Sequence, residues 1–534
     1  TGDQIWILPT ADGSADQVLA TNGSGTLSFA TVSGTTINNN ADNRVITGSG
    51  TANTLNGEAN LTFDGSTLTV SGNVSVDSGT IKLDGNYPTG TGNVALGDTA
   101  LDDGSLSGGS NVAIGSGALT ANTSGASNTA VGKDSLAALT TGNYNVGIGL
   151  DALTTNATGA DNVAIGWNAL TTSTVSYSTA VGTKALAANT TGNANTAVGR
   201  RALEDNTTAN YNVAVGNNAL ANNTTAANNT AVGTDSLTTN TTGANNTALG
   251  YAALDANTTA SNNTAVGAHA LDANTTASSN TAVGSAALGA NTTGTYNVAV
   301  GAAALDANTT ANGNTALGYN ALSSSTTGAN NIGIGLNALV TSTTGAQNIG
   351  IGNYSGDAIT DGTYNVFLGY EAGTATTTAD YNTGLGSQTL AANTTGASNT
   401  ALGRQALYAN TTGGNNTAVG TYSLDANTTG EENTALGDGS LGTNTTGDRN
   451  VALGARALLA ATSSDNTAVG YDALGDSTTG GDNVAIGGRT LAVATTADNN
   501  VAVGYQAGTA VTTGGSNTCI GAATGDSTVT TGGG

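Results

Sequence analysis

The 534-residue chain has little of what enzymes, disulfide-stabilised domains and membrane proteins are built from. It contains one cysteine, one histidine, two prolines and no methionine. A single cysteine, Cys519, excludes an internal disulfide framework, and we expect it to be a small buried thiol. With His269 as the only histidine, we expect neither a catalytic triad nor a multi-histidine metal site. No run of about 18 apolar residues occurs, so we expect no membrane insertion.

Positive charge is also scarce. Ten Lys and Arg residues stand against 35 Asp and Glu residues, which gives a net charge of −25. Such a surface repels phosphate backbones, so nucleic acid is excluded as a partner. Aromatic residues make up only 4% of the chain, which is typical of disordered polar chains as well as of some repeat proteins. The regular spacing of the apolar residues argues against disorder.

A repeat of 17 residues dominates the sequence. Its core, Asn-[Thr/Val]-[Ala/Gly]-[Val/Ile/Leu]-Gly, begins at Asn93 and occurs 26 times, ending with the copy at Asn517. Of the 25 intervals, 22 are 17 residues, one is 18 and two are 16. We number the repeat from this Asn, so that the consensus N-[TV]-A-[VIL]-G-x-x-[AS]-L-x-x-N-T-T-[GA]-x-x occupies positions 1 to 17. A fixed period of this length indicates a repeat architecture.

The residue types within the repeat predict β-structure. Positions 1–5 alternate β-branched and small residues, so positions 2 and 4 face one side and positions 1, 3 and 5 the other. We expect Asn-Thr-Thr-Gly, at positions 12–15, to turn the chain through left-handed backbone. Seventeen residues are too few for a helix pair, and glycine opposes helix. The prediction is an all-β parallel β-solenoid, or β-roll, of about 26 coils, with a rod on the order of 120 Å long.

The apolar residues predict association of several chains. One coil has a thin core, and aliphatic residues occur at position 4 as well as at position 9, where Leu stands in 22 of 26 copies. One set then packs inside the coil while the other faces a partner, and small residues at positions 3 and 5 allow backbones to approach closely. We therefore predict a homotrimer, with a monomeric solenoid as the alternative.

The chain divides into three predicted parts. Residues 1–92 lack the repeat and are predicted to be a β-rich stalk or attachment segment, in which Asp64-Gly65 between two alternating runs signals a hairpin. Residues 93–525 form the solenoid, and residues 526–534 are a Gly-rich tail. The chain begins at Thr1 without Met, and we expect both ends to be cuts in a longer protein.

Aromatic residues beside the predicted strand are the candidate binding residues. They stand just before position 1 or just after the glycine at position 5, where they form stacking platforms for sugars, cover the edge of the strand or seal contacts between chains. The candidates for carbohydrate stacking are Trp167, Tyr251, Tyr319, Tyr370, Tyr471 and Tyr505. Aspartates recur irregularly at position 10 (Asp255, Asp272, Asp306 and Asp425), where we expect a solvated edge and no metal site. No cofactor is expected.

Two families resemble the repeats. The core in Asn111-Val112-Ala113-Ile114-Gly115 is similar to the head repeats of trimeric autotransporter adhesins, and the fuller pattern from Asn263 to Thr276 resembles repeats of phage tail-fibre proteins. Residues 17–28 also resemble a segment common in phage fibres. The adhesin heads are trimeric left-handed β-rolls with a repeat nearer 14 residues, so this resemblance implies a trimer and an extracellular location and transfers no catalytic residue.

The resulting expectation is a non-enzymatic structural fibre outside the cell. It would be a virion tail fibre or appendage that mediates attachment to a host-surface glycan or protein receptor. The alternative is a bacterial surface adhesin, or an ice- or carbohydrate-binding solenoid, whose repeat face binds the ligand directly. Ice binding usually requires a Thr-x-Thr array, whereas the two threonines of this consensus, at positions 13 and 14, are adjacent and point to opposite sides.

Overall fold

The computed structural model describes residues 7–11, 17–31, 36–38, 44–48, 54–63, 68–72 and 91–525. The chain separates into two compact units, Thr1–Leu83 and Asp84–Gly534. The predicted Gly-rich tail, residues 526–534, lies outside the described residues, as does the predicted turn at Asp64-Gly65.

The described part of the first unit contains two small sheets. Strands β1 (Gln17–Thr21) and β2 (Leu27–Thr31) pair as an antiparallel hairpin. A second sheet contains β3 (Thr36–Asn38), β4 (Arg44–Gly48), β5 (Thr54–Phe63) and β6 (Leu68–Val70). In this sheet β5 pairs antiparallel with β4 and β6, and parallel with β3. The antiparallel pairing of β5 with β6 is the one that the hairpin signal predicted.

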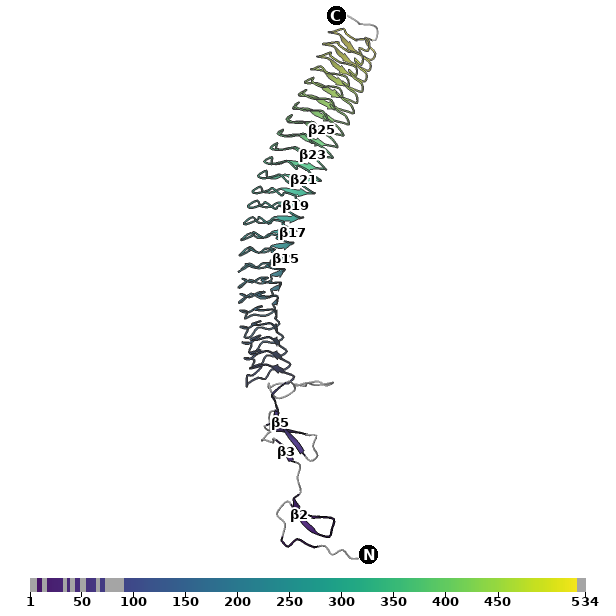
Figure 1. The fold of residues 1–534 in the computed structure, drawn as a ribbon. Coiled ribbons are helices and arrows are strands. Elements are labelled where there is room, and N and C mark those ends of the chain that lie inside the picture. Colours follow the sequence, from purple (N-terminus) through teal and green to yellow (C-terminus); the bar gives the residue numbers. More distant parts are fainter. Residues whose placement is uncertain are drawn as a thin grey trace. The chain divides into compact units, whose positions relative to one another are not determined.

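The second unit is the predicted solenoid, with one three-residue strand in every repeat. Each strand pairs in parallel with its neighbours, so that positions 2, 3 and 4 lie beside the same positions of the next coil (Figure 1). Among the described strands, β7 pairs with β8 and β32 with β31, so the sheet is an open ladder. The strands are β7 (Val94–Leu96), β8 (Val112–Ile114), β9 (Thr129–Val131), β10 (Val146–Ile148), β11 (Val163–Ile165), β12 (Thr179–Val181), β13 (Thr196–Val198), β14 (Val213–Val215), β15 (Thr230–Val232), β16 (Thr247–Leu249), β17 (Thr264–Val266), β18 (Thr281–Val283), β19 (Val298–Val300), β20 (Thr315–Leu317), β21 (Ile332–Ile334), β22 (Ile349–Ile351), β23 (Val366–Leu368), β24 (Thr383–Leu385), β25 (Thr400–Leu402), β26 (Thr417–Val419), β27 (Thr434–Leu436), β28 (Val451–Leu453), β29 (Thr467–Val469), β30 (Val484–Ile486), β31 (Val501–Val503) and β32 (Thr518–Ile520).

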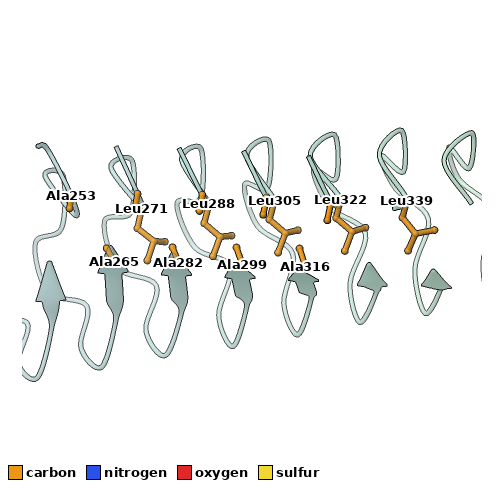
Figure 2. Packing of buried hydrophobic residues seen from close by; sticks show 14 of the residues in the cluster. Ala253, Ala265, Leu271, Ala282, Leu288, Ala299, Leu305, Ala316, Leu322 and Leu339 are labelled. Carbon is orange, nitrogen blue, oxygen red and sulfur yellow. The ribbon is translucent and has the colours of Figure 1, made fainter. Parts of the chain in front are cut away.

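The core of each coil is made by positions 3, 8 and 9. In the coil that begins at Asn297 these are Ala299, Ala304 and Leu305, all fully buried. Figure 2 shows the leucines of successive coils one after another, directed towards the alanines of the strands. The rows join into one continuous hydrophobic core along the stack. Where a leucine at position 9 fills the side of the coil opposite the strand, an alanine at position 3 is sufficient to fill the strand side.

Asparagines at positions 1 and 12 close the coils and tie each to the next, except where another residue such as Ser178 or Ser325 stands in their place. At position 1, the amide of Asn297 donates to the carbonyl of Ala311 at 2.8 Å, and its own carbonyl oxygen accepts the backbone N–H of Asn314 at 2.9 Å. At position 12, Asn308 also donates to Ala311, at 3.2 Å, and to Asn291 of the preceding coil at 2.8 Å. These amides are fully buried, where the hydrogen bonds satisfy groups that would be costly to leave unpaired.

Left-handed backbone occurs where the sequence did not suggest it. We expected it at Asn and Gly of positions 12–15, but the asparagines there serve the ladder. Positive φ values instead recur at positions 7, 9 and 17, as in Leu305 (φ 53°), and at the glycine of position 5. A left-handed leucine costs roughly 1–2 kcal/mol. Here that backbone sends its N–H to the carbonyl of Ala321 in the next coil, at 3.0 Å, while the side chain fills the core.

The glycine at position 5 also corrects an expectation. We took the small residues at positions 3 and 5 to allow close approach of another chain. Position 3 is instead inside the coil, and position 5 stacks on its own equivalent. Gly301 has φ 137°, and a Cβ there would lie 2.3 Å from the carbonyl oxygen of Gly318. Small residues at both positions are therefore needed by the single chain.

Candidate interaction surface

The outer face of the strand ladder is a continuous surface along the described solenoid. Because positions 1 and 3 point inward, positions 2 and 4 point outward. Position 4 is Val, Ile or Leu in all 26 strands, and none of these side chains is buried. Leu249, for example, is 46% exposed and Leu402 is 41% exposed. Position 2 holds Thr, Val or Ile throughout. An aliphatic row therefore faces outward along the whole ladder.

The aromatic side chains predicted to stack on sugars lie beside this face, at position 6. All six are exposed: Trp167, Tyr251, Tyr319, Tyr370, Tyr471 and Tyr505. The solenoid places them two to six coils apart, so it does not bring them together as one site. Trp167 lies 6.0 Å from the ammonium of Lys184, and Tyr251 meets His269 edge-on with ring centroids 5.2 Å apart. Each ring therefore forms a separate small platform.

A tyrosine pair that we had not selected forms the one stacked aromatic surface among the described residues. Tyr364 and Tyr381 stand at position 17 of neighbouring repeats, and their rings stack with centroids 5.1 Å apart and an interplanar angle of 9°. Their spacing of one period was the available signal, because an in-register parallel ladder places such residues directly over one another. Both rings are about half exposed.

The stacked pair adjoins the one strand that has tyrosine on both sides. Tyr364 precedes the coil of β23 and Tyr370 follows its glycine. Hydrogen bonding to Glu371 raises the pKa of Tyr370, and a hydrogen bond from Gln388 at 2.9 Å lowers the pKa of Glu371. The outer side chains between the two tyrosines are Val366 and Leu368. Aromatic, aliphatic and hydrogen-bonding groups therefore meet at this coil.

The polar groups elsewhere on the coils are dispersed. His269 contacts Asp272 at 3.1 Å, and both side chains are exposed enough to reach solvent. At position 10, burial raises the pKa of Asp255, Asp306 and Asp425. Within the described ranges, no group of three or more His, Cys, Asp or Glu residues is arranged to hold a metal ion. Those ranges also contain no helix long and apolar enough to cross a membrane.

Cys519 occupies position 3 of the final described strand. Its thiol is free and only partly buried, whereas the alanines at the same position of inner coils are fully buried. It packs against the end of the hydrophobic core. The expectation of a buried thiol is therefore met only in part: Cys519 stands at a core position of the last described coil but remains partly exposed.

No family model, curated protein or solved structure matches this chain.

Proposed function

We propose that the chain is the shaft of a structural, non-enzymatic fibre outside the cell, assembled as a homotrimer. The observation that carries this proposal is the unbroken stack of 26 strands, each hydrogen-bonded to its neighbours in one register. Backbone and asparagine ladders run along the rod, so that every coil supports the next. A long self-supporting stack is suited to holding other parts of a molecule at a distance.

The biological setting follows from the resemblance of the repeats. Their Asn-x-Ala-Val/Ile-Gly core is similar to trimeric adhesin heads, and their longer pattern resembles phage tail fibres. We therefore favour a virion tail fibre or appendage that mediates attachment to a glycan or protein receptor on the host surface. A bacterial surface adhesin is the alternative. The net charge of −25 argues against nucleic acid as a partner.

Native mass and particle shape test the proposal together. Light scattering after size exclusion is expected to give about three times the chain mass of 51.2 kDa. Negative-stain images of the same fraction are expected to show rods on the order of 120 Å or longer. A mass of one chain with the same rod contradicts the trimer, and compact particles contradict the fibre.

Direct carbohydrate binding is a second candidate, favoured by the tyrosines around β23. Tyr364 and Tyr381 offer stacked rings before the strand, and Glu371 and Gln388 supply hydrogen-bonding groups after it. A glycan array with the full chain is expected to yield binding that falls in Tyr364→Ala and Tyr370→Ala. Tyr319→Ala, which removes a single ring three coils away, serves as the control. Equal loss in all three variants contradicts a site at this coil.

Ice binding is the least supported alternative. At position 13, the threonine hydroxyl is already engaged: that of Thr309 donates to the backbone carbonyl of Thr326 at 3.2 Å. Position 14 then leaves a single exposed threonine row, as at Thr310. A thermal-hysteresis measurement tests this directly, and we expect no hysteresis.

A further inference from the structure

The outer strand face carries a residue pattern that the fold of one chain does not require. Positions 2 and 4 of the 26 strands contain no charged residue, although the chain has 45 charged residues in total. In a strand with one face in water, apolar and polar residues usually alternate, with the apolar ones inside and the polar ones outside. Here the buried strand residue is alanine, and the larger aliphatic residue is outside. Positions 3, 8 and 9 fill the inside of the coil, and position 4 is not part of that core.

We propose that this outer strand face, made by positions 2 and 4 of the coils, is the surface through which copies of the chain dock side by side, parallel and in register. The inference rests on the proposed trimeric fibre and identifies its contact surface. Contiguous exposed apolar surfaces larger than a few hundred Å² mark interaction sites in soluble proteins.

The length and period of the face identify the occupant as another copy of this chain. The aliphatic row continues from Leu96 to Ile520 without interruption by a polar side chain. A partner that covers it without gaps must be equally long and must rise by the same step in each coil. A second copy placed at the same height meets both conditions, with each strand beside its own equivalent.

Charge favours this face over the acidic sides of the coil. Each copy carries a net charge of −25, so copies repel one another wherever their acidic side chains meet. Nearly all acidic side chains of the repeats stand at positions 6, 7, 10, 11, 16 and 17, whereas the outer strand face carries none; the threonine row of position 14 carries only Asp361 but is polar. Position 4 is always aliphatic and position 2 includes threonine, which places position 4 at the centre of the contact and position 2 nearer its rim.

The area is sufficient for a stable assembly. Burying an aliphatic side chain gains about 1.5–3 kcal/mol, which at about 25 cal/mol per Å² corresponds to roughly 60–120 Å² of apolar surface. A side chain that is about 40% exposed therefore offers on the order of 40 Å² to a partner. Fourteen of the 26 side chains of position 4 are exposed to this degree and together offer on the order of 600 Å². The other twelve are less exposed, and with the side chains of position 2 they bring the face to the order of the about 800 Å² per partner of a standard stable interface.

Cysteine cross-linking tests the face and the register. In a Cys519→Ser background, Leu249→Cys is expected to form disulfides between chains on mild oxidation. Thr259→Cys, exposed at position 14 of the same coil, is the matched control and is expected to remain reduced. In mixed assemblies, Leu249→Cys should link to itself and not to Leu402→Cys, nine coils away. Links at Thr259, or links between Leu249→Cys and Leu402→Cys, overturn the face or its register respectively.

Charged residues introduced at position 4 test the docking face separately from the trimer itself. The triple variant Leu249→Glu, Leu317→Glu and Leu385→Glu is expected to reduce the native mass from three chains to one, with the circular dichroism of the solenoid retained. The same change at Thr259, Thr327 and Thr395 is expected to leave the mass unchanged. A three-chain mass that survives the first set, with no disulfide from Leu249→Cys, overturns the docking face and leaves the trimeric fibre intact. A single-chain mass for the unmodified protein instead overturns the trimer itself, and with it this inference.

Discussion

Two stretches of the same solenoid solve the problem of filling a coil differently. In the regular coils around Asn297, alanine at position 3 faces leucine at position 9, and both are fully buried. In the coil of β23, position 3 is Phe367, and position 9 is Gly373. The strands on either side carry Gly350 and Gly384 at position 3, and Gly356 replaces the leucine of the preceding coil. One large side chain therefore occupies the space of several smaller ones.

The comparison shows that the cross-section of the coil is maintained while its residues change. A Cβ at Gly373 would lie 2.6 Å from the Phe367 ring, and one at Gly384 would lie 3.0 Å from it. The phenylalanine is nevertheless fully buried, like the leucines of the regular coils. Because strands on both sides must stay in register, a change in one coil is accommodated by its neighbours. Interiors packed to this density require such compensation.

The largest expected effect removes the feature that both stretches share, the glycine of position 5. Gly301 lies in a regular coil and Gly369 in the β23 coil, and each has positive φ and a carbonyl oxygen of the next coil 2.3 Å from its would-be Cβ. Gly301→Val and Gly369→Val are each expected to destabilise their coil by more than about 4 kcal/mol, because neither the backbone nor the neighbour can yield. Hydrogen exchange of the flanking strands measures this locally.

Gly104→Val is the matched control for both valines. Gly104 has no positive φ, and a Cβ there meets no atom within 4 Å. We expect protection of its coil to remain at the level of the unmodified chain. Equal loss of protection in all three variants would mean that added bulk, rather than stacking at position 5, is responsible.

The next largest effect separates the two ways of filling the core. Phe367→Ala leaves a cavity that the surrounding glycines do not fill, and is expected to cost about 3 kcal/mol. Gly373→Leu alone is expected to clash with the ring. The double variant restores the regular pair and should recover most of the stability lost, since Leu at position 9 already adopts the φ of Gly373 elsewhere. A double-mutant cycle, measured by hydrogen exchange of β22–β24, checks this. Additive losses of stability in the double variant would contradict the interpretation that Phe367 and a residue at position 373 occupy the same space.

The period and strand residues were sufficient to predict the fold class. Seventeen-residue spacing with β-branched residues and glycine predicted the parallel solenoid and the number of its coils. The direction in which each strand faced could not be decided, because alternation separates positions 3 and 4 but both are apolar. The narrow cross-section decides it: leucine at position 9 leaves room for Ala299 and directs Val300 outward. Left-handed leucine had no signal in residue type.

A smaller, stabilising effect is expected where the asparagine ladder of the regular coils stops. The ladder at position 12 runs through Asn291 and Asn308 and ends at Ser325, with Ile359 in place of asparagine two coils further on. The buried carbonyl oxygen of Asn308 consequently has no hydrogen-bond partner. Ser325→Asn supplies a donor to it and is expected to add about 1 kcal/mol.

The control for the ladder is Ser325→Ala, which supplies no donor and is expected to leave the exchange of this coil nearly unchanged. A gain in both variants would attribute the effect to removal of the serine hydroxyl. A loss in Ser325→Asn would show that this coil is too narrow for the larger amide, and that the ladder ends there for steric reasons.

The candidate surface was less predictable than the fold. The exposed tyrosines of position 6 were recognised from their place beside the strand. They are far apart from one another because several coils lie between them. Tyr364 and Tyr381 needed only the additional step of comparing residues one period apart. The outward direction of position 4 required the coil itself, because Val and Leu are ordinarily the residues assigned to a core.

The smallest expected effect concerns pH and again distinguishes the β23 region. Burial raises the pKa of Asp357, at position 10 of the preceding coil, to about 6, with Glu371 contributing. The folded coil therefore holds this proton more tightly than the unfolded chain. The stabilisation is fully present below pH 3.8, the ordinary pKa, and is lost as the pH rises through about 6. Because Asp357 is partly exposed, we expect the stabilisation of the coil to be less than about 1 kcal/mol.

Hydrogen exchange of β22 at pH 4 and pH 7, corrected for intrinsic rates, should show the loss of this stabilisation at the higher pH. Asp357→Asn should abolish it, while Asp361→Asn, which removes an exposed carboxylate from the same coil, should retain it; a pH response that survives Asp357→Asn would assign the effect to the general acidity of the chain.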